Sequence, residues 1–149
     1  MITRKAIIED LKDLTILFNE YRIFYKKDSD LKGATEFLRE RISKNDSEIY
    51  VCELANEQLA GFTQLYPLFS STKMKRLWLM NDLYVNAEFR GQGLSILLIE
   101  RAKQLVIESN ACGMYLETGI TNEIGNKLYP RIGFTLNKSS NFYEWNYSD

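Results

Sequence analysis

The spacing of hydrophobic residues divides the chain into alternating strand and helix segments. Short runs rich in β-branched and aromatic residues predict strands, whereas apolar residues that recur every three or four positions predict helices. The predicted strands cover residues 2–8, 47–54, 59–66, 77–85, 113–119, 135–136 and 142–147. The predicted helices cover residues 10–27, 30–42, 94–110 and 124–132, the first two starting at the potential capping residues Asp10 and Asp30. This order is typical of an α/β fold.

The connections between these segments limit how the strands can pair. Residues 55–58 form a short polar link, which predicts an antiparallel hairpin whose second strand is closed by Pro67. The helix 94–110 joins two strands, so strands 77–85 and 113–119 should be parallel. The last two predicted strands form a closing hairpin. We therefore expect a mixed sheet of six to seven strands with about four helices.

Length, composition and charge favour one globular domain over residues 1–149. The hydrophobic content of 45% suffices for a core, and the net charge of −1, without a long basic run, argues against nucleic acid or anionic lipid as a partner. The N-terminal residues lack the apolar core of a signal peptide, and no window reaches membrane-spanning length. We expect a cytoplasmic protein.

The sequence contains no histidine and two separate cysteines, Cys52 and Cys112. The cysteines lack a C-x-x-C partner, which favours reduced, small apolar side chains over a disulfide, a zinc site or an acyl carrier. Without histidine, Ser-His-Asp and Cys-His catalysis and the usual metal ligands are excluded. We expect no metal site, and proton transfer must use carboxylates, tyrosine, lysine or water.

A glycine-rich segment, Arg90-Gly91-Gln92-Gly93, lies between the strand 77–85 and the following helix. Two glycines allow backbone N–H groups to converge on an anion, the helix dipole favours negative charge there, and Arg90 adds a positive charge. The segment is not a dinucleotide fingerprint, because Ile96 stands at the third glycine position, and no lysine follows Gly93 as in a P-loop. It predicts a diphosphate cradle, with an ordinary loop as the alternative.

Two motifs resemble the GNAT superfamily of N-acetyltransferases. Residues 90–95 resemble its acyl-CoA signature, Arg-x-x-Gly-x-Gly/Ala, except that Ser95 replaces the last small apolar residue. Asn122, Tyr129 and the pair Gly133-Phe134 resemble a second family pattern, one helix and one strand later. Because both motifs occur in the order that this superfamily has, the chain resembles the superfamily over nearly its whole length.

The resemblance implies a GNAT-like domain in which the two central parallel strands splay apart to admit acetyl-CoA. Backbone groups at the end of strand 77–85 would pair with the pantetheine arm, N–H groups of the cradle would bind the pyrophosphate, and the second motif would line the other wall. The cofactor-binding residues implied are Leu83, Tyr84, Val85, Arg90, Gly91, Gln92, Gly93, Leu94, Ser95, Asn122 and Gly125.

The chemistry of acetyl transfer defines the catalytic candidates. An alkylammonium, with a pKa near 10.4, must lose a proton before it attacks the thioester, so a carboxylate near a strand bulge is needed, either Asp82 or Glu117. The Leu83 N–H would stabilise the oxyanion. The resemblance assigns Tyr129 as the acid for the departing thiolate, although Pro130 removes the next helical N–H. Alternatively, Tyr129 is a core aromatic residue and Asp82 a solvated or capping carboxylate.

The predicted function is N-acetyltransferase activity from acetyl-CoA to a primary amine of a small molecule or peptide, by direct attack in a ternary complex. The alternatives are a non-catalytic acyl-CoA-binding sensor and a structural or interaction domain. Residues 79–85 also resemble the spermidine/spermine acetyltransferase branch, but Asn81 replaces its glutamate, which weakens a polyamine assignment.

Aromatic residues are concentrated in two further segments. The Tyr and Phe stripe of the first helix is interpreted as packing rather than substrate contact. At the C-terminal end, aromatic side chains could form a homodimer interface or cover the core. These residues are Phe142, Tyr143, Trp145 and Tyr147.

Overall fold

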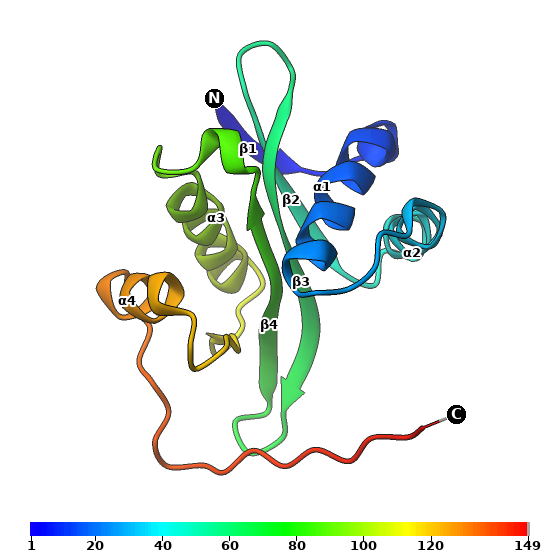
Figure 1. The fold of residues 1–149 in the computed structure, drawn as a ribbon. Coiled ribbons are helices and arrows are strands. Elements are labelled where there is room, and N and C mark those ends of the chain that lie inside the picture. Colours follow the sequence, from blue (N-terminus) through cyan, green and yellow to red (C-terminus); the bar gives the residue numbers. More distant parts are fainter. Residues whose placement is uncertain (149) are drawn as a thin grey trace. The chain divides into compact units, whose positions relative to one another are not determined.

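The computed structural model describes residues 1–148, which form an α/β fold with four helices and a five-stranded mixed sheet (Figure 1). The chain divides into two compact units, Met1–Glu117 and the segment that begins at Thr118. The strands are β1 (Ile2–Lys5), β2 (Glu48–Glu53), β3 (Leu59–Ser70), β4 (Lys75–Val85) and β5 (Met114–Tyr115). The helices are α1 (Leu11–Phe24), α2 (Leu31–Lys44), α3 (Leu94–Glu108) and α4 (Glu123–Arg131), with 3-10 turns at Ile8–Asp10 and Ala87–Phe89.

The strands follow their sequence order across the sheet, β1-β2-β3-β4-β5. The first three pairings are antiparallel, and β5 is parallel to β4, as the crossover through α3 requires. The predicted β2–β3 hairpin and the parallel crossover are therefore confirmed. The predicted domain extent, residues 1–149, stays a prediction.

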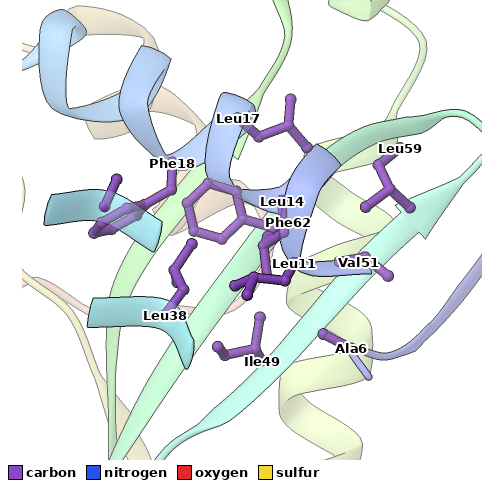
Figure 2. Packing of buried hydrophobic residues seen from close by; sticks show 11 residues of the cluster. Ala6, Leu11, Leu14, Leu17, Phe18, Leu38, Ile49, Val51, Leu59 and Phe62 are labelled. Carbon is purple, nitrogen blue, oxygen red and sulfur yellow. The ribbon is translucent and has the colours of Figure 1, made fainter. Parts of the chain in front are cut away.

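Helices cover both faces of the sheet in the first unit (Figure 1). On the face of α1 and α2, Phe18 lies edge-on to Phe62 of β3, with ring centroids 6.1 Å apart, and Leu38 of α2 is fully buried beside them (Figure 2). On the other face, Arg101 of α3 lies over the Tyr50 ring at 4.3 Å. Each fully buried Leu or Phe contributes about 1.5–3 kcal/mol, so this packing holds the helices that surround the site.

The two predicted helix caps behave differently. The Asp30 carboxylate accepts a hydrogen bond from the Gly33 N–H at 2.9 Å, which confirms it as the cap of α2. A Cβ on Gly33 would lie 2.4 Å from an Asp30 oxygen, so the absence of a side chain permits the cap. Asp10 makes no cap bond, because its carboxylate accepts from the Ile7 N–H and from Arg4 instead.

The predicted strand boundaries are wrong in four places. The strand predicted at residues 2–8 ends at Lys5, and Ile8 lies in a 3-10 turn. Pro67 does not end β3, which continues to Ser70, because the pairing of β3 with β2 ends at Leu65 and the imide nitrogen interrupts no ladder on that side. The strand predicted at 113–119 is reduced to β5. The predicted hairpin at 135–136 and 142–147 contains no strand within residues 1–148, so the sheet has five strands rather than six or seven.

Candidate active site

A bulge in β4 lies at the centre of the candidate site. Gln64 of β3 pairs with Asp82, but the next residue, Leu65, pairs with Met80. Asn81 is therefore the extra residue of β4, and such a bulge changes the direction of the neighbouring side chains. Asn81 is exposed, whereas Asp82 is only 3% exposed. The bulge thus places a carboxylate inside the protein.

Both oxygens of the Asp82 carboxylate accept hydrogen bonds from amide groups. Gln64 Nε2 donates to Oδ2 at 2.6 Å, and Asn81 Nδ2 donates to Oδ1 at 2.8 Å. Ser47 Oγ donates to Gln64 Oε1 at 2.8 Å, which fixes the orientation of that amide. No salt bridge found in residues 1–148 involves Asp82. The carboxylate is held by neutral donors that leave its charge uncompensated.

The surroundings of Asp82 change its affinity for protons. Burial raises the pKa of the Asp82 carboxyl above its ordinary value of 3.8, and hydrogen bonds from Gln64, Asn81 and Tyr21 oppose this shift. A carboxylate with a raised pKa holds a proton more tightly than an exposed one. It is therefore better suited to accept a proton from an amine near neutral pH.

Asp82 and Asn81 line a cavity of about 290 Å³. Most of the cavity lining is aromatic, and two basic side chains complete it. The remaining lining residues are Phe18, Tyr21, Arg22, Tyr25, Lys27, Phe37 and Tyr66. Burial raises the pKa of Tyr21, Tyr25 and Tyr66, so their hydroxyls stay protonated at neutral pH. The cavity therefore brings aromatic rings, neutral hydroxyls and two cations next to a buried carboxylate.

The predicted diphosphate cradle (residues 90–95) has the backbone that its glycines permit. Gly91 and Gly93 have φ angles of 76° and 79°, in the left-handed region that favours glycine, and a Cβ on either would meet no atom within 4 Å. Gly93 is the N-cap residue of α3, and no side chain caps the helix. The first N–H groups of α3 are thus available to an anion.

The Arg90 side chain contacts the strand and the helix next to this loop. Its Nε donates to the Val85 carbonyl oxygen at 3.0 Å, and its guanidinium lies over the rings of Phe24 and Tyr84, at 5.9 and 5.6 Å. These contacts attach the loop to the end of β4 and to α1. In this conformation Arg90 positions the cradle through packing, a role that the sequence did not predict.

The end of β4 has one edge without a strand partner. The parallel pairing with β5 is limited to Trp78 with Met114 and Leu79 with Tyr115, whereas β4 continues to Val85. The Asp82 carbonyl oxygen accepts a hydrogen bond from Thr63 Oγ1 of β3 at 2.8 Å. Because the peptide bond is trans, the Leu83 N–H points the opposite way, toward the unpaired edge.

Glu117, the other predicted base candidate, is exposed and does not line the cavity. The structure therefore separates the two carboxylates by environment. The Asp82 carboxylate is buried, hydrogen-bonded and next to the cavity, whereas the Glu117 side chain is exposed and lies outside the cavity lining.

The second motif forms a compact local structure around α4. The Asn122 side chain caps the helix by accepting from the Gly125 N–H at 3.2 Å, and it donates to Thr118 Oγ1 at 2.8 Å. Gly125 is buried, and a Cβ there would lie 2.7 Å from Asn122 and 3.1 Å from the Tyr129 ring. Glycine at this position permits close packing against the tyrosine.

The end of α4 is a Schellman motif that holds Tyr129. The Phe134 N–H donates to the Tyr129 carbonyl and the Gly133 N–H to the Pro130 carbonyl, while Gly133 has a φ of 100°. The rings of Tyr129 and Phe134 lie edge to face, 5.8 Å apart. The helix continues past Pro130 to Arg131. The Tyr-to-Gly-Phe spacing thus has a structural basis within this unit.

Several residues that line the cavity or hold the Asp82 carboxylate were not predicted as site residues. Tyr66 and Gln64 lie in an apolar strand run, and Tyr21 and Tyr25 were interpreted as packing.

In the described part of the chain, no cluster of potential metal ligands is present, and no helix is long and apolar enough to cross a membrane. Cys52 is buried and Cys112 partly buried, and both are free thiols.

Comparisons with known proteins agree on one family. A sequence profile described as the Acetyltransferase (GNAT) family matches residues 12–134. The uncharacterised N-acetyltransferase YhfO of Bacillus subtilis (strain 168) is 39% identical over 134 residues, which cover 90% of this chain and 89% of YhfO.

Solved structures show the same fold. A crystal structure of a probable acetyltransferase has a TM-score of 0.95 at 37% identity, covering 100% of this chain and 99% of the other. The ribosomal-protein-alanine N-acetyltransferase of Brucella melitensis biovar Abortus 2308 has a TM-score of 0.78 at 19% identity, covering 97% of this chain and 100% of that protein. At this lower identity, the second likeness concerns the fold alone.

Proposed function

The chain belongs to the acetyltransferase (GNAT) family, and on this basis we propose that it transfers an acetyl group from acetyl-CoA to a primary amine of a small molecule or peptide. The observation that carries the proposal is the buried Asp82 carboxylate beside the β4 bulge, at the wall of a cavity. Direct attack in a ternary complex is favoured because neither thiol is placed to carry the acetyl group. Cys52 is inaccessible in the core, where burial raises the pKa of its thiol, and Cys112 does not line the cavity.

The residues present fit acetyl-CoA as a cosubstrate. The positive-φ glycines and the uncapped start of α3 suit its diphosphate. On the unpaired edge from Leu83 to Val85, main-chain groups other than the Val85 carbonyl, which Arg90 occupies, would pair with the amide groups of the pantetheine arm in the manner of an added strand. Asn122 and Gly125 remain proposed as the residues of the other wall.

Each catalytic candidate has a defined part in the proposed reaction. Asp82 accepts the proton that the acceptor ammonium must lose, and the Leu83 N–H stabilises the negative charge on the thioester oxygen, a contribution of about 3 kcal/mol. Tyr129 then donates its proton to the departing thiolate. Glu117 is the less suitable base because it lies in solvent outside the cavity.

A binding and turnover experiment tests the proposal. Acetyl-CoA affinity is measured by calorimetry, and CoA release is followed with a panel of amino acids, polyamines, aminoglycosides and peptides. Binding together with transfer to at least one amine supports the proposed function. Binding and thermal stabilisation without transfer would favour an acyl-CoA sensor, and no binding at all would favour a structural domain.

Two further properties are proposed with the activity. Free thiols fit a reducing compartment, so we place the reaction in the cytoplasm. We also propose that two copies associate through the aromatic C-terminal segment, residues 142–147, whose large side chains are exposed in a single chain. Trp145 in this segment is 85% exposed.

A further inference from the structure

The basic residues of the cavity restrict the kind of amine that it accepts. Arg22 and Lys27 both line the cavity, and Asp82 is the only acidic residue among the described lining residues. Neither cation belongs to a salt bridge found in residues 1–148. Arg22 Nη1 donates to the Asp28 carbonyl oxygen at 3.0 Å, and this neutral partner leaves its charge uncompensated. The lining therefore has two cations for one buried anion.

The other walls select a small, partly apolar molecule. The rings of Phe18, Tyr21 and Phe37 form a stacked aromatic wall, with centroids 6.2 and 5.6 Å from Phe18. A volume of about 290 Å³ lies at the lower end of the range of small-molecule sites. A long peptide or an oligosaccharide would extend well outside it.

We propose that the acceptor is a small amine that also carries a carboxylate and an apolar body. This inference rests on the proposed function and names the substrate class of the same cavity. The amine would face Asp82, the carboxylate would face Arg22 and Lys27, and the body would lie on the aromatic rings. Charge-assisted hydrogen bonds from Arg and Lys recognise a carboxylate, whereas a polyamine would bring further positive charge to two cations.

Matched acceptor pairs test this inference. L-phenylalanine is compared with 2-phenylethylamine, and L-leucine with 3-methylbutylamine, so that each pair differs by one carboxylate. We expect kcat/KM for acetyl transfer to be at least about tenfold higher for the carboxylate member, as a hydrogen bond to a charged group predicts. Lys27→Gln should lower this preference about tenfold. Lys26→Gln removes a neighbouring charge outside the cavity lining and should preserve the preference.

Binding measurements separate this inference from the proposed reaction. Calorimetry of the same four amines with the protein in saturating CoA reports acceptor preference without turnover. A carboxylate preference in binding that is lost in Lys27→Gln supports the inference, whether or not acetylated product forms. Absence of product would reject only the proposed acetyltransferase function. Equal binding and transfer within each pair, or spermidine as the best acceptor, would overturn the inference. Either result would leave the proposed acetyltransferase function intact.

Discussion

Asp82 links the local structure of the bulge to the pH dependence of the proposed reaction. The base must be deprotonated, so kcat/KM should fall as the pH drops through the pKa of Asp82, which burial places above the ordinary carboxyl value of 3.8. Asp82→Asn keeps the size of the side chain but removes the proton acceptor. We expect kcat/KM at pH 7 to fall about 100-fold and the acidic decline to disappear, as measured by steady-state CoA release across pH.

Glu117→Gln is the matched control for this prediction. It removes the charge of the exposed rival carboxylate and should leave the pH profile close to that of the wild type. The assignment of Asp82 would be wrong if Glu117→Gln abolished the acidic decline and Asp82→Asn did not. Acetyl-CoA affinity, measured separately, should be similar in all three proteins.

Tyr129 is predicted to act through its hydroxyl rather than its ring. The Schellman motif fixes the backbone at Tyr129, and the ring packs on Phe134, so Tyr129→Phe keeps both contacts. We expect kcat to decrease about 100-fold, in the range of lost general-acid catalysis. Turnover of an identified acceptor at the wild-type rate would reject the acid role and leave Tyr129 as a packing residue.

At the scale of elements, the start of α3 combines a conformational and a binding requirement. Gly93→Ala introduces a Cβ at a φ of 79°, which costs about 1–2 kcal/mol of folding stability and moves the N–H groups that follow. We expect the Kd for CoA, measured by calorimetry, to rise at least about tenfold.

Gly119→Ala is the control for backbone strain, because Gly119 has no positive φ and a Cβ there would meet no atom within 4 Å. Its CoA affinity and stability should match the wild type. If Gly93→Ala lost stability without losing CoA affinity, the cradle would be a structural turn only.

Elements with strong local signals could be predicted from the sequence, and those that depend on distant partners could not. The Asp30 cap and the β2–β3 hairpin follow from neighbouring residues. The length of β5 depends on where its pairing with β4 stops, at Leu79 and Tyr115. Strand propensity in the C-terminal segment says nothing about whether a pairing edge is available to it.

The same distinction holds at the scale of the whole molecule. The glycines of the cradle could be recognised because a positive φ is a property of single residues. The cavity could not be recognised, because Tyr21 of α1, Tyr66 of β3 and Asp82 of β4 meet only after the sheet has formed. A tyrosine in an apolar pattern looks the same whether it fills a core or lines a pocket.

The C-terminal segment provides the prediction about assembly. Its aromatic side chains alternate along residues 142–147, and Tyr143, Trp145 and Tyr147 are 86%, 85% and 78% exposed. Since so much clustered apolar surface is unfavourable in water, we expect a concentration-dependent dimer in sedimentation velocity experiments. Trp145→Ser should shift the equilibrium toward monomer, whereas Phe69→Ser, at an aromatic residue that is 73% exposed on β3, should not. Equal weakening by both variants would mean that the association depends on total apolar surface rather than on this segment.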